Sequence, residues 1–258
     1  MGHSFASLEP LIVAEVLDYL TLRDAIQASY VNKASRRIVL KYLSERYNLS
    51  QYLSVFKDPK SLLATFRRTG AILSGSRALA YFLPSIRPFT ESSDWDIYVS
   101  FPHQETLHKE LGKQAFLPIP RSKAQPKPSE FKVYNFRNDC GNVKVQLVVL
   151  EPGRSLYQCM MGFHLSIVQN CISGWGCYSM YWGSTLERRG WMAERLDGFP
   201  EYQTEMVEKY GVRGIRLVPW AERERTNGVV YAVSWGRRMG DLERYITFGE
   251  FKKELQNE

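Results

Sequence analysis

Two aspartates near the middle of the chain have the type and spacing that phosphate chemistry needs. Asp94 and Asp96 lie two positions apart in the segment Ser-Asp-Trp-Asp-Ile-Tyr-Val at 93–99. Residues i and i+2 of a β-strand point to the same face, about 7 Å apart along the backbone. Their oxygens can then converge on Mg²⁺ ions ~4 Å apart, which is the geometry of two-metal catalysis. The sequence therefore predicts a catalytic metal site at Asp94 and Asp96.

Gly75 and Ser76 have the residue types of a phosphate-binding turn. A Gly-Ser turn that enters a helix offers backbone N–H groups and a hydroxyl to phosphate oxygens. Arg77 follows directly and adds a positive charge within reach of phosphate. An Asp-x-Asp pair by itself usually lies on the solvent-facing side of a strand. A Gly-Ser pair by itself is an ordinary turn sequence. The ordered combination of strand, Gly-Ser, helix and Asp-x-Asp strand is what predicts one shared site.

The elements that must position these residues follow from the apolar spacing. Asp58 as N-cap and Pro59 at the first helical position begin a helix that Gly70 closes. On the strand with the aspartates, Trp95 and Ile97 alternate with them and are expected to be buried. The predicted strands are 71–73, 94–100, 131–136, 143–150, 215–218 and 229–234. The predicted helices are 77–82, 104–114, 155–172, 201–210 and 248–255.

Residues 72–76 (Ile-Leu-Ser-Gly-Ser), followed by 93–99, resemble the signature of polymerase-beta-type nucleotidyltransferases. The segment 162–170 resembles a group of fungal proteins with this domain, so the resemblance spans roughly 62–189. It implies an α/β (α+β) mixed-sheet fold. It also implies transfer of a nucleoside monophosphate from an NTP, with Mg²⁺ or Mn²⁺ as cofactor. Asp94 and Asp96 would be the catalytic, metal-binding residues, and the nucleotide-binding residues would be Gly75, Ser76, Arg77 and Gln146.

The sequence departs from this family at one important position. The family places a third carboxylate on a following strand, and the candidate strand here is 143–150 (Val-Lys-Val-Gln-Leu-Val-Val-Leu). Val145 and Leu147 alternate inward, so Gln146 is the residue that faces the metals. An amide oxygen can ligate a cation, but the amide cannot accept a proton from the attacking hydroxyl. Asp139 and Glu151 are close in sequence but lie in the turn and at the strand end. The fold is therefore predicted more firmly than the activity.

The N-terminal residues are predicted to form three short helices. The first of them has an apolar stripe made of Leu8, Leu11, Ile12, Val16, Leu17 and Leu20. A third helix begins at Lys33, with Ile38, Tyr42 and Leu43 expected inward. The residues 8–36 resemble an F-box, which implies docking onto a Skp-type adaptor of a ubiquitin ligase. A helical cap that packs on the main domain explains the same leucines. The predicted division is a helical module at 1–55 and a nucleotidyltransferase-like domain with a helical C-terminal extension at 56–258.

Bulk composition narrows the function classes. The net charge of +7 favours polyanionic partners. However, the basic pairs Arg36-Arg37, Arg67-Arg68, Arg188-Arg189 and Arg237-Arg238 are scattered, which favours a solvated surface over a dedicated groove. Four cysteines without CxxC spacing argue against a zinc site and for a reducing, cytoplasmic or nuclear compartment. No run approaches the ~20 apolar residues of a membrane span.

Three functions remain open at this point. In the first hypothesis, the chain is an Mg²⁺-dependent nucleotidyltransferase acting on RNA, a nucleotide or a protein hydroxyl. Alternatively, it is a catalytically impaired relative of that fold that binds a nucleotide or a partner, as Gln146 suggests. The third hypothesis is an F-box-type substrate receptor, which is compatible with either of the first two.

Overall fold

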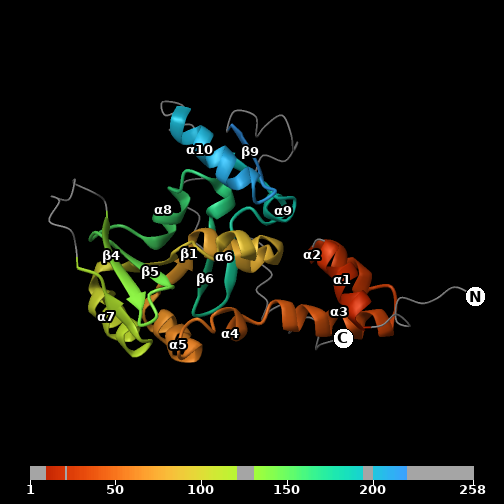
Figure 1. Ribbon diagram of the computed structural model, residues 1–258, viewed down its shortest axis with the longest axis horizontal. Helices are drawn as coiled ribbons and strands as arrows, with labels where there is room; N and C mark the ends of the chain where they lie inside the picture. Colours follow the sequence, from red (N-terminus) through yellow and green to blue (C-terminus); the bar gives the residue numbers. More distant parts are fainter. Residues whose placement is uncertain (1–9, 21, 121–130, 194–199, 220–258) are drawn as a thin grey trace, which may run out of the picture.

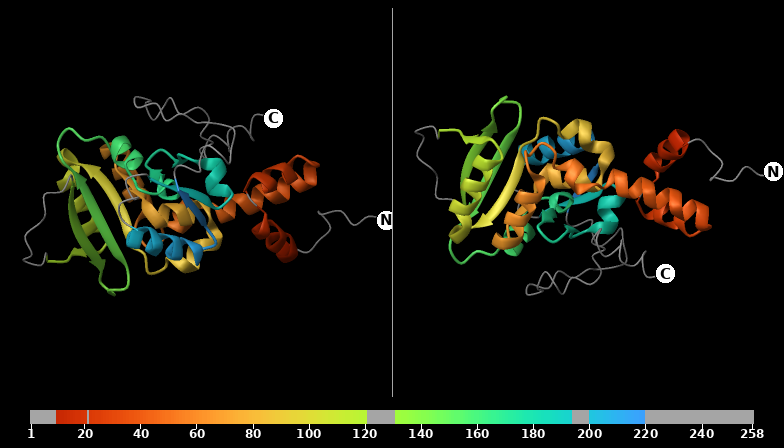
Figure 2. Two further views of the ribbon diagram at one scale, coloured as in Figure 1. Left: turned by 90° about the horizontal axis from the view of Figure 1, so that it is seen from above. Right: turned by 90° about the horizontal axis from the view of Figure 1, so that it is seen from below.

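The computed structural model describes residues 10–20, 22–120, 131–193 and 200–219 (Figure 1). Most of them form a mixed α/β body, and three N-terminal helices extend from one side of it in every view (Figures 1 and 2). The strand predicted at 229–234 and the helix predicted at 248–255 lie outside the described residues.

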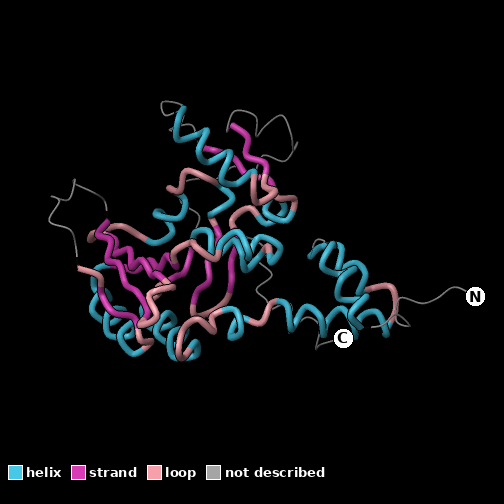
Figure 3. The backbone as a smooth tube through the Cα atoms, in the orientation of Figure 1, coloured by secondary structure: helices cyan, strands magenta, loops and turns pink. Residues whose placement is uncertain are grey.

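A seven-stranded sheet with the order β3-β4-β5-β2-β1-β6-β7 forms the centre of the body (Figure 3). The sheet is mixed, because β2 and β5 run parallel and the other neighbouring strands described in it run antiparallel. Its strands are β1 (Ile72–Ser74), β2 (Trp95–Ser100), β3 (Phe116–Pro118), β4 (Phe131–Asn138), β5 (Lys144–Leu150), β6 (Asn170–Ser173) and β7 (Cys177–Ser179). The mixed-sheet α/β class predicted from the sequence is thus confirmed.

The helices flank this sheet. The α-helices are α1 (Pro10–Tyr19), α2 (Leu22–Ser29), α3 (Lys33–Arg46), α4 (Leu49–Tyr52), α5 (Pro59–Thr69), α6 (Gly75–Phe82), α7 (Gln104–Lys113), α8 (Leu156–Met161), α9 (Trp182–Leu186) and α10 (Pro200–Gly211). The 3₁₀ segments among the described residues are η2 (Pro84–Thr90), η3 (Phe101–His103) and η4 (Ser166–Val168). A second, parallel pair joins β8 (Arg189–Met192) to β9 (Arg216–Pro219).

Strand β2 has the alternation that the sequence predicts. Trp95, Ile97 and Val99 are buried, while Asp96 and Tyr98 on the opposite face are only half-buried. The buried face packs in one apolar cluster with residues of α5 and α7, among them Phe66 and Leu111. A slip of one residue would turn Asp96 into this apolar layer, so burial of the apolar face fixes the register of β2.

Helix α5 begins and ends as predicted. The Asp58 side chain accepts a hydrogen bond from the Ser61 N–H at 3.0 Å, and Pro59 is the first helical residue. Gly70 ends the helix in the left-handed conformation at φ 69°. The chain then turns directly into β1, so that α5 delivers the strand that leads to Gly75.

The C-terminal part departs from the sequence prediction. The helix predicted at 155–172 is wrong beyond Met161, where α8 ends after starting from a capping box of Ser155 and Gln158. Residues 170–173 instead form β6, which pairs with β1. Cys171 and Ile172 are fully buried there, and the open edge of β1 supplies partners for their backbone. The predicted helix at 201–210 and strand at 215–218 are confirmed as α10 and β9.

The N-terminal helices have both a buried and an exposed apolar side. Val13 and Leu17 of α1 pack with Val39 and Leu43 of α3. Of the residues expected inward on the third helix, Leu43 is buried, while Ile38 and Tyr42 are half-buried. On the outer side, Ile12 is 46% exposed and Val16 is 39% exposed.

The end of α3 is anchored on the body. The Tyr81 hydroxyl on α6 donates a hydrogen bond to the carbonyl of Tyr47 at 2.8 Å. The Arg87 Nη2 in η2 donates to the carbonyl of Arg46 at 3.0 Å.

Among the described residues, no helix combines the length and apolar character that crossing a bilayer requires.

Candidate active site

Asp94, Asp96 and Gln146 lie together on one face of the central sheet. The parallel pairing of β2 with β5 sets Asp96 opposite Gln146. The Gln146 Nε2 donates a hydrogen bond to the Asp94 Oδ2 at 2.8 Å. Val145 and Leu147 are fully buried on the other face, as the sequence predicts. The structure therefore places Gln146 beside the two aspartates, at the position expected for a third carboxylate.

The two acidic residues near Gln146 in sequence lie elsewhere. Glu151 forms an ion pair with Lys132, with 3.4 Å between the Glu151 Oε1 and the Lys132 Nζ. It follows Gln146 by five positions, which is ~17 Å along an extended strand. Asp139 is exposed in the turn between β4 and β5. Neither takes the place of the third carboxylate.

The Gly75 turn brings backbone directly against Asp96. Antiparallel pairing sets Ser74 of β1 opposite Asp96 of β2, and Gly75 follows with φ 75°. A Cβ atom on residue 75 would lie 2.5 Å from the Asp96 Oδ2. Glycine is therefore required twice, for its left-handed backbone and for the close approach of the carboxylate. This is the contact that joins the predicted phosphate turn to the predicted metal pair.

Ser76 lies in the first turn of α6, beside backbone N–H groups that have no partner within the helix. Its Oγ accepts a hydrogen bond from the Arg213 Nη1 at 3.0 Å. The Tyr210 hydroxyl also hydrogen-bonds to Ser76. The preceding Ser74 turns away, and its hydroxyl donates to the carbonyl of Asn170 at 2.6 Å. The first turn of α6 thus presents one hydroxyl, and an arginine from the C-terminal part lies on it.

Arg77 is close to the aspartates but is held by the loop that precedes them. Its Nε donates to the carbonyl of Ser93 at 3.1 Å, and its Nη2 donates to that of Glu91 at 2.6 Å. The guanidinium lies over the Trp95 ring, 4.9 Å from the ring centroid. Burial lowers the pKa of Arg77, and the nearby charges of Glu91 and Asp94 act in the opposite direction. In this conformation the hydrogen bonds of Arg77 hold the loop segment that leads to Asp94.

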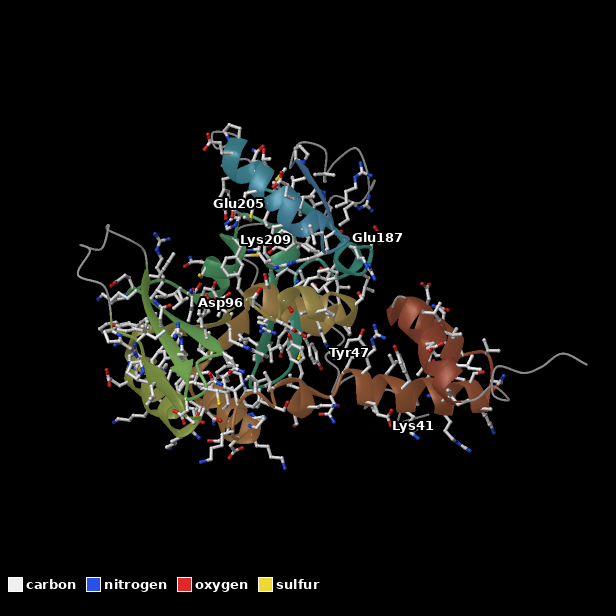
Figure 4. The ribbon with its side chains drawn as sticks, viewed as in Figure 1. Lys41, Tyr47, Asp96, Glu187, Glu205 and Lys209 are labelled. Carbon is white, nitrogen blue, oxygen red and sulfur yellow. The ribbon has the colours of Figure 1, made fainter. Side chains whose placement is uncertain are left out.

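Three residues from α10 and the turn after it complete the site, and the sequence analysis missed them. Lys209 lies near enough to Asp96 for its charge to stabilise the carboxylate, and both are labelled in Figure 4. Tyr210 and Arg213 contact Ser76, and Arg213 is only 7% exposed. More than a hundred residues separate them from the Gly75 turn, so no local pattern connects them. The burial of Arg213, which is unusual for an arginine without a partner, is visible only in the structure.

The charge of Asp96 is poorly stabilised by the protein alone. Burial, together with the charge of the neighbouring Asp94, raises the pKa of Asp96 to about 7, and Lys209 opposes the shift. A divalent cation between the two carboxylates would favour the ionised form of both. Mg²⁺ is commonly held by one or two carboxylates together with substrate phosphates. The donor set at Asp94 and Asp96 fits that mode.

The described residues contain no group of three or more His, Cys, Asp or Glu side chains that could hold a metal by themselves. His164, in the segment that resembles the fungal group, is hydrogen-bonded through Nε2 to the Tyr202 hydroxyl at 2.6 Å. Its contact holds α10 against the segment after α8.

No protein-family model, no curated protein and no solved structure matches this chain.

Proposed function

We propose that this chain is a Mg²⁺-dependent nucleotidyltransferase. It would transfer a nucleoside monophosphate from an NTP to a hydroxyl of RNA, a nucleotide or a protein. The observation that carries the proposal is the contact of the Gly75 turn with Asp96. It sets the start of α6, which would bind phosphate, against a pair of carboxylates. The polymerase-beta-type fold remains part of this proposal.

The residues divide between the two ends of the triphosphate. Asp94 and Asp96 would hold Mg²⁺, which neutralises the triphosphate and activates the attacking oxygen. The Ser76 hydroxyl and the N–H groups at the start of α6 would bind the outgoing phosphates. Arg213 and Lys209 lie on the same side and add positive charge to them.

The reaction is a simple displacement at the α-phosphorus. The acceptor oxygen forms a bond to this phosphorus, and the bond to the oxygen bridging to pyrophosphate breaks. The Gln146 amide cannot take the acceptor's proton, which leaves to water. Gln146 instead holds Asp94 in place through its hydrogen bond. We therefore expect slow transfer compared with a site that has three carboxylates.

The test is incubation with Mg²⁺ and each α-labelled NTP, in the presence of RNA. The Asp94→Ala/Asp96→Ala variant is compared with Glu105→Gln, which changes an exposed carboxylate on α7. Label on RNA, protein or nucleotide that is lost only in the double variant supports the proposal. No transfer with any NTP by a protein whose circular dichroism is native would refute it.

One observation favours a second function for the N-terminal helices. Ile12 and Val16 are exposed on α1, although Val13 and Leu17 on the same helix are buried. Leu20 is half-buried, and the side chain of Leu11 lies outside the described ones. This exposed face suits docking of a Skp-type adaptor. In this alternative, the body is a catalytically impaired fold that binds a nucleotide or a target.

Binding of a purified Skp-type adaptor tests this alternative directly. Ile12→Asp/Val16→Asp should abolish the complex, whereas Leu117→Asp should leave it intact. Leu117 is 61% exposed on β3 and serves as the matched control. Equal binding by both variants, or by neither, would rule out docking through this face.

The four free cysteines fit a cytoplasmic or nuclear protein, and we include this localisation in the proposal.

A further inference from the structure

Arginines from four separate parts of the chain follow one another along α6 and η2. Arg213 is the first, bound to Ser76 at the start of α6. The helix has eight residues and is therefore ~12 Å long. The remaining arginines lie near its other end and near η2, so the group extends well beyond the length of a single phosphate.

Arg188 is the second of these residues. It is exposed, and its Nη2 donates to the Ser85 Oγ at 3.0 Å. Its Nη1 lies close to Gly214, directly after Arg213, since a Cβ built on Gly214 would be 3.4 Å from it. The backbone of Arg188 is left-handed at φ 53°, which costs ~1 kcal/mol for a residue with a side chain. The side chain of Arg188 thus lies between Gly214 and η2.

Arg46 and Arg87 continue the group at the end of α3. Arg87 donates to the carbonyl of Ala80 at 3.3 Å and to that of Arg46 at 3.0 Å, and its guanidinium lies over the Tyr52 ring. Arg46 lies over the Tyr42 ring. Burial lowers the pKa of Arg46, and repulsion from Arg87 and Arg188 lowers it further. Like charges are thus held near one another, and Tyr47, which follows Arg46 in the chain, is labelled in Figure 4.

We propose that Arg188 and Arg46 bind successive phosphates of a single-stranded RNA acceptor, whose 3′ end reaches the site at Asp94 and Asp96. Arg87 is a positioning residue that fixes the end of α3. The inference rests on the proposed function for the role of the strand as acceptor. A positively charged track beside the site and the net charge of +7 both favour a polyanionic strand. A mononucleotide acceptor would not reach these arginines.

Binding of a 5′-fluorescein oligouridylate, measured by fluorescence anisotropy over a range of KCl concentrations, tests the proposal. The variant Arg188→Ala/Arg46→Ala is compared with Arg137→Ala/Lys109→Ala, which removes two exposed charges on β4 and α7. Loss of two phosphate contacts from a single strand should reduce the salt slope by about 1.4. It should also weaken binding roughly tenfold, while affinity for a fluorescent NTP stays unchanged.

Equal affinity and equal salt slope in the two double variants would overturn the proposal. The single variant Arg188→Ala guards against misfolding, because its side chain is exposed, and it should lose about half of the effect on the slope. A polyglutamate peptide that binds as tightly as RNA, with the same dependence on Arg188, would also overturn it. The anisotropy measurements with RNA use protein carrying Asp94→Ala/Asp96→Ala without NTP, and the affinity for a fluorescent NTP is measured on the same arginine variants with Asp94 and Asp96 intact. Failure of transfer and failure of RNA binding are therefore separate results.

Discussion

Two groups of side chains meet at the start of α6, and they are positioned in different ways. The acidic group, Asp94 and Asp96 with Gln146, lies on adjacent parallel strands, and the buried residues between them fix its register. The basic group, Lys209 and Arg213, comes from α10 and the turn after it. The acidic group is held by the central sheet, whereas the basic group is held by side-chain contacts across the surface of α6.

This difference indicates how each group responds to change. A sheet register cannot shift by less than a full residue, so the acidic group is retained or lost as a unit. The basic group depends on a few hydrogen bonds, each of which contributes modestly. Substitutions at the start of α6, where the two groups meet, should therefore have the largest effects. Substitutions within either group should have smaller ones.

The largest effect is expected from Gly75→Ala. The new Cβ would fall 2.5 Å from the Asp96 Oδ2, so the carboxylate or the turn must move by about 1 Å. A displacement of this size lowers the transfer rate by ~100-fold. Steady-state transfer assays measure the loss.

Gly70→Ala is the matched control for this prediction. Gly70 has a nearly identical left-handed backbone at φ 69°, but a Cβ there would meet no atom within 4 Å. Both variants should lose ~1 kcal/mol of unfolding free energy from strain. Only Gly75→Ala should lose activity. A similar loss of activity in both would show that backbone strain, and not the contact with Asp96, is responsible.

The next largest effect is expected at Arg213. Arg213→Ala removes a charge that is hydrogen-bonded to Ser76 beside the proposed phosphate site. A charged hydrogen bond contributes ~2 kcal/mol, which corresponds to ~30-fold in the affinity for an NTP. Titration with a fluorescent NTP measures it. Arg216→Ala, an exposed residue on β9, should bind the nucleotide normally, and equal losses in both variants would contradict a specific role.

Gln146→Glu should affect stability in a metal-dependent manner. The substitution replaces the hydrogen bond to Asp94 with a third negative charge. In EDTA this should destabilise the fold by ~1.5 kcal/mol. Mg²⁺ should then raise the melting temperature more in this variant than in the parent. Gln51→Glu, which is exposed on α4, should show no such dependence. The absence of any response to Mg²⁺ in Gln146→Glu would argue against a metal at Asp94 and Asp96.

The smallest effect is expected from the pH dependence of Asp96. Its pKa is raised from 3.8 to about 7 in the folded protein, mainly by burial. The folded state therefore binds a proton that the unfolded state releases, and stability falls as the pH rises from about 4 to about 7. Asp96→Asn removes this loss. It should stabilise the metal-free protein at pH 8 and have little effect at pH 4.

Urea unfolding in EDTA at the two pH values measures this difference. Asp139→Asn serves as the control, because Asp139 is exposed in the turn between β4 and β5. A constant difference between Asp96→Asn and the parent across the pH range would show that the pKa of Asp96 is not raised by folding.

The sequence alone determined the acidic half of the site. Alternation of Trp95 and Ile97 with the aspartates, and of Val145 and Leu147 around Gln146, is a local period of two. Because one face of each strand is buried, this alternation fixes the register of the strands. Asp58, Pro59 and Gly70 likewise fixed the ends of α5 through local hydrogen bonding and backbone conformation.

Only the tertiary structure decided the remainder. Residues 170–173 became a strand because the edge of β1 pairs with them, which no local pattern in 155–172 shows. Arg213 reaches Ser76 across more than a hundred residues, and Arg46, Arg87 and Arg188 are scattered in the sequence. Such groups are brought together by the packing of α10, η2 and α3 around α6. Packing depends on contacts distant in sequence, whereas strand period and helix capping depend on near neighbours.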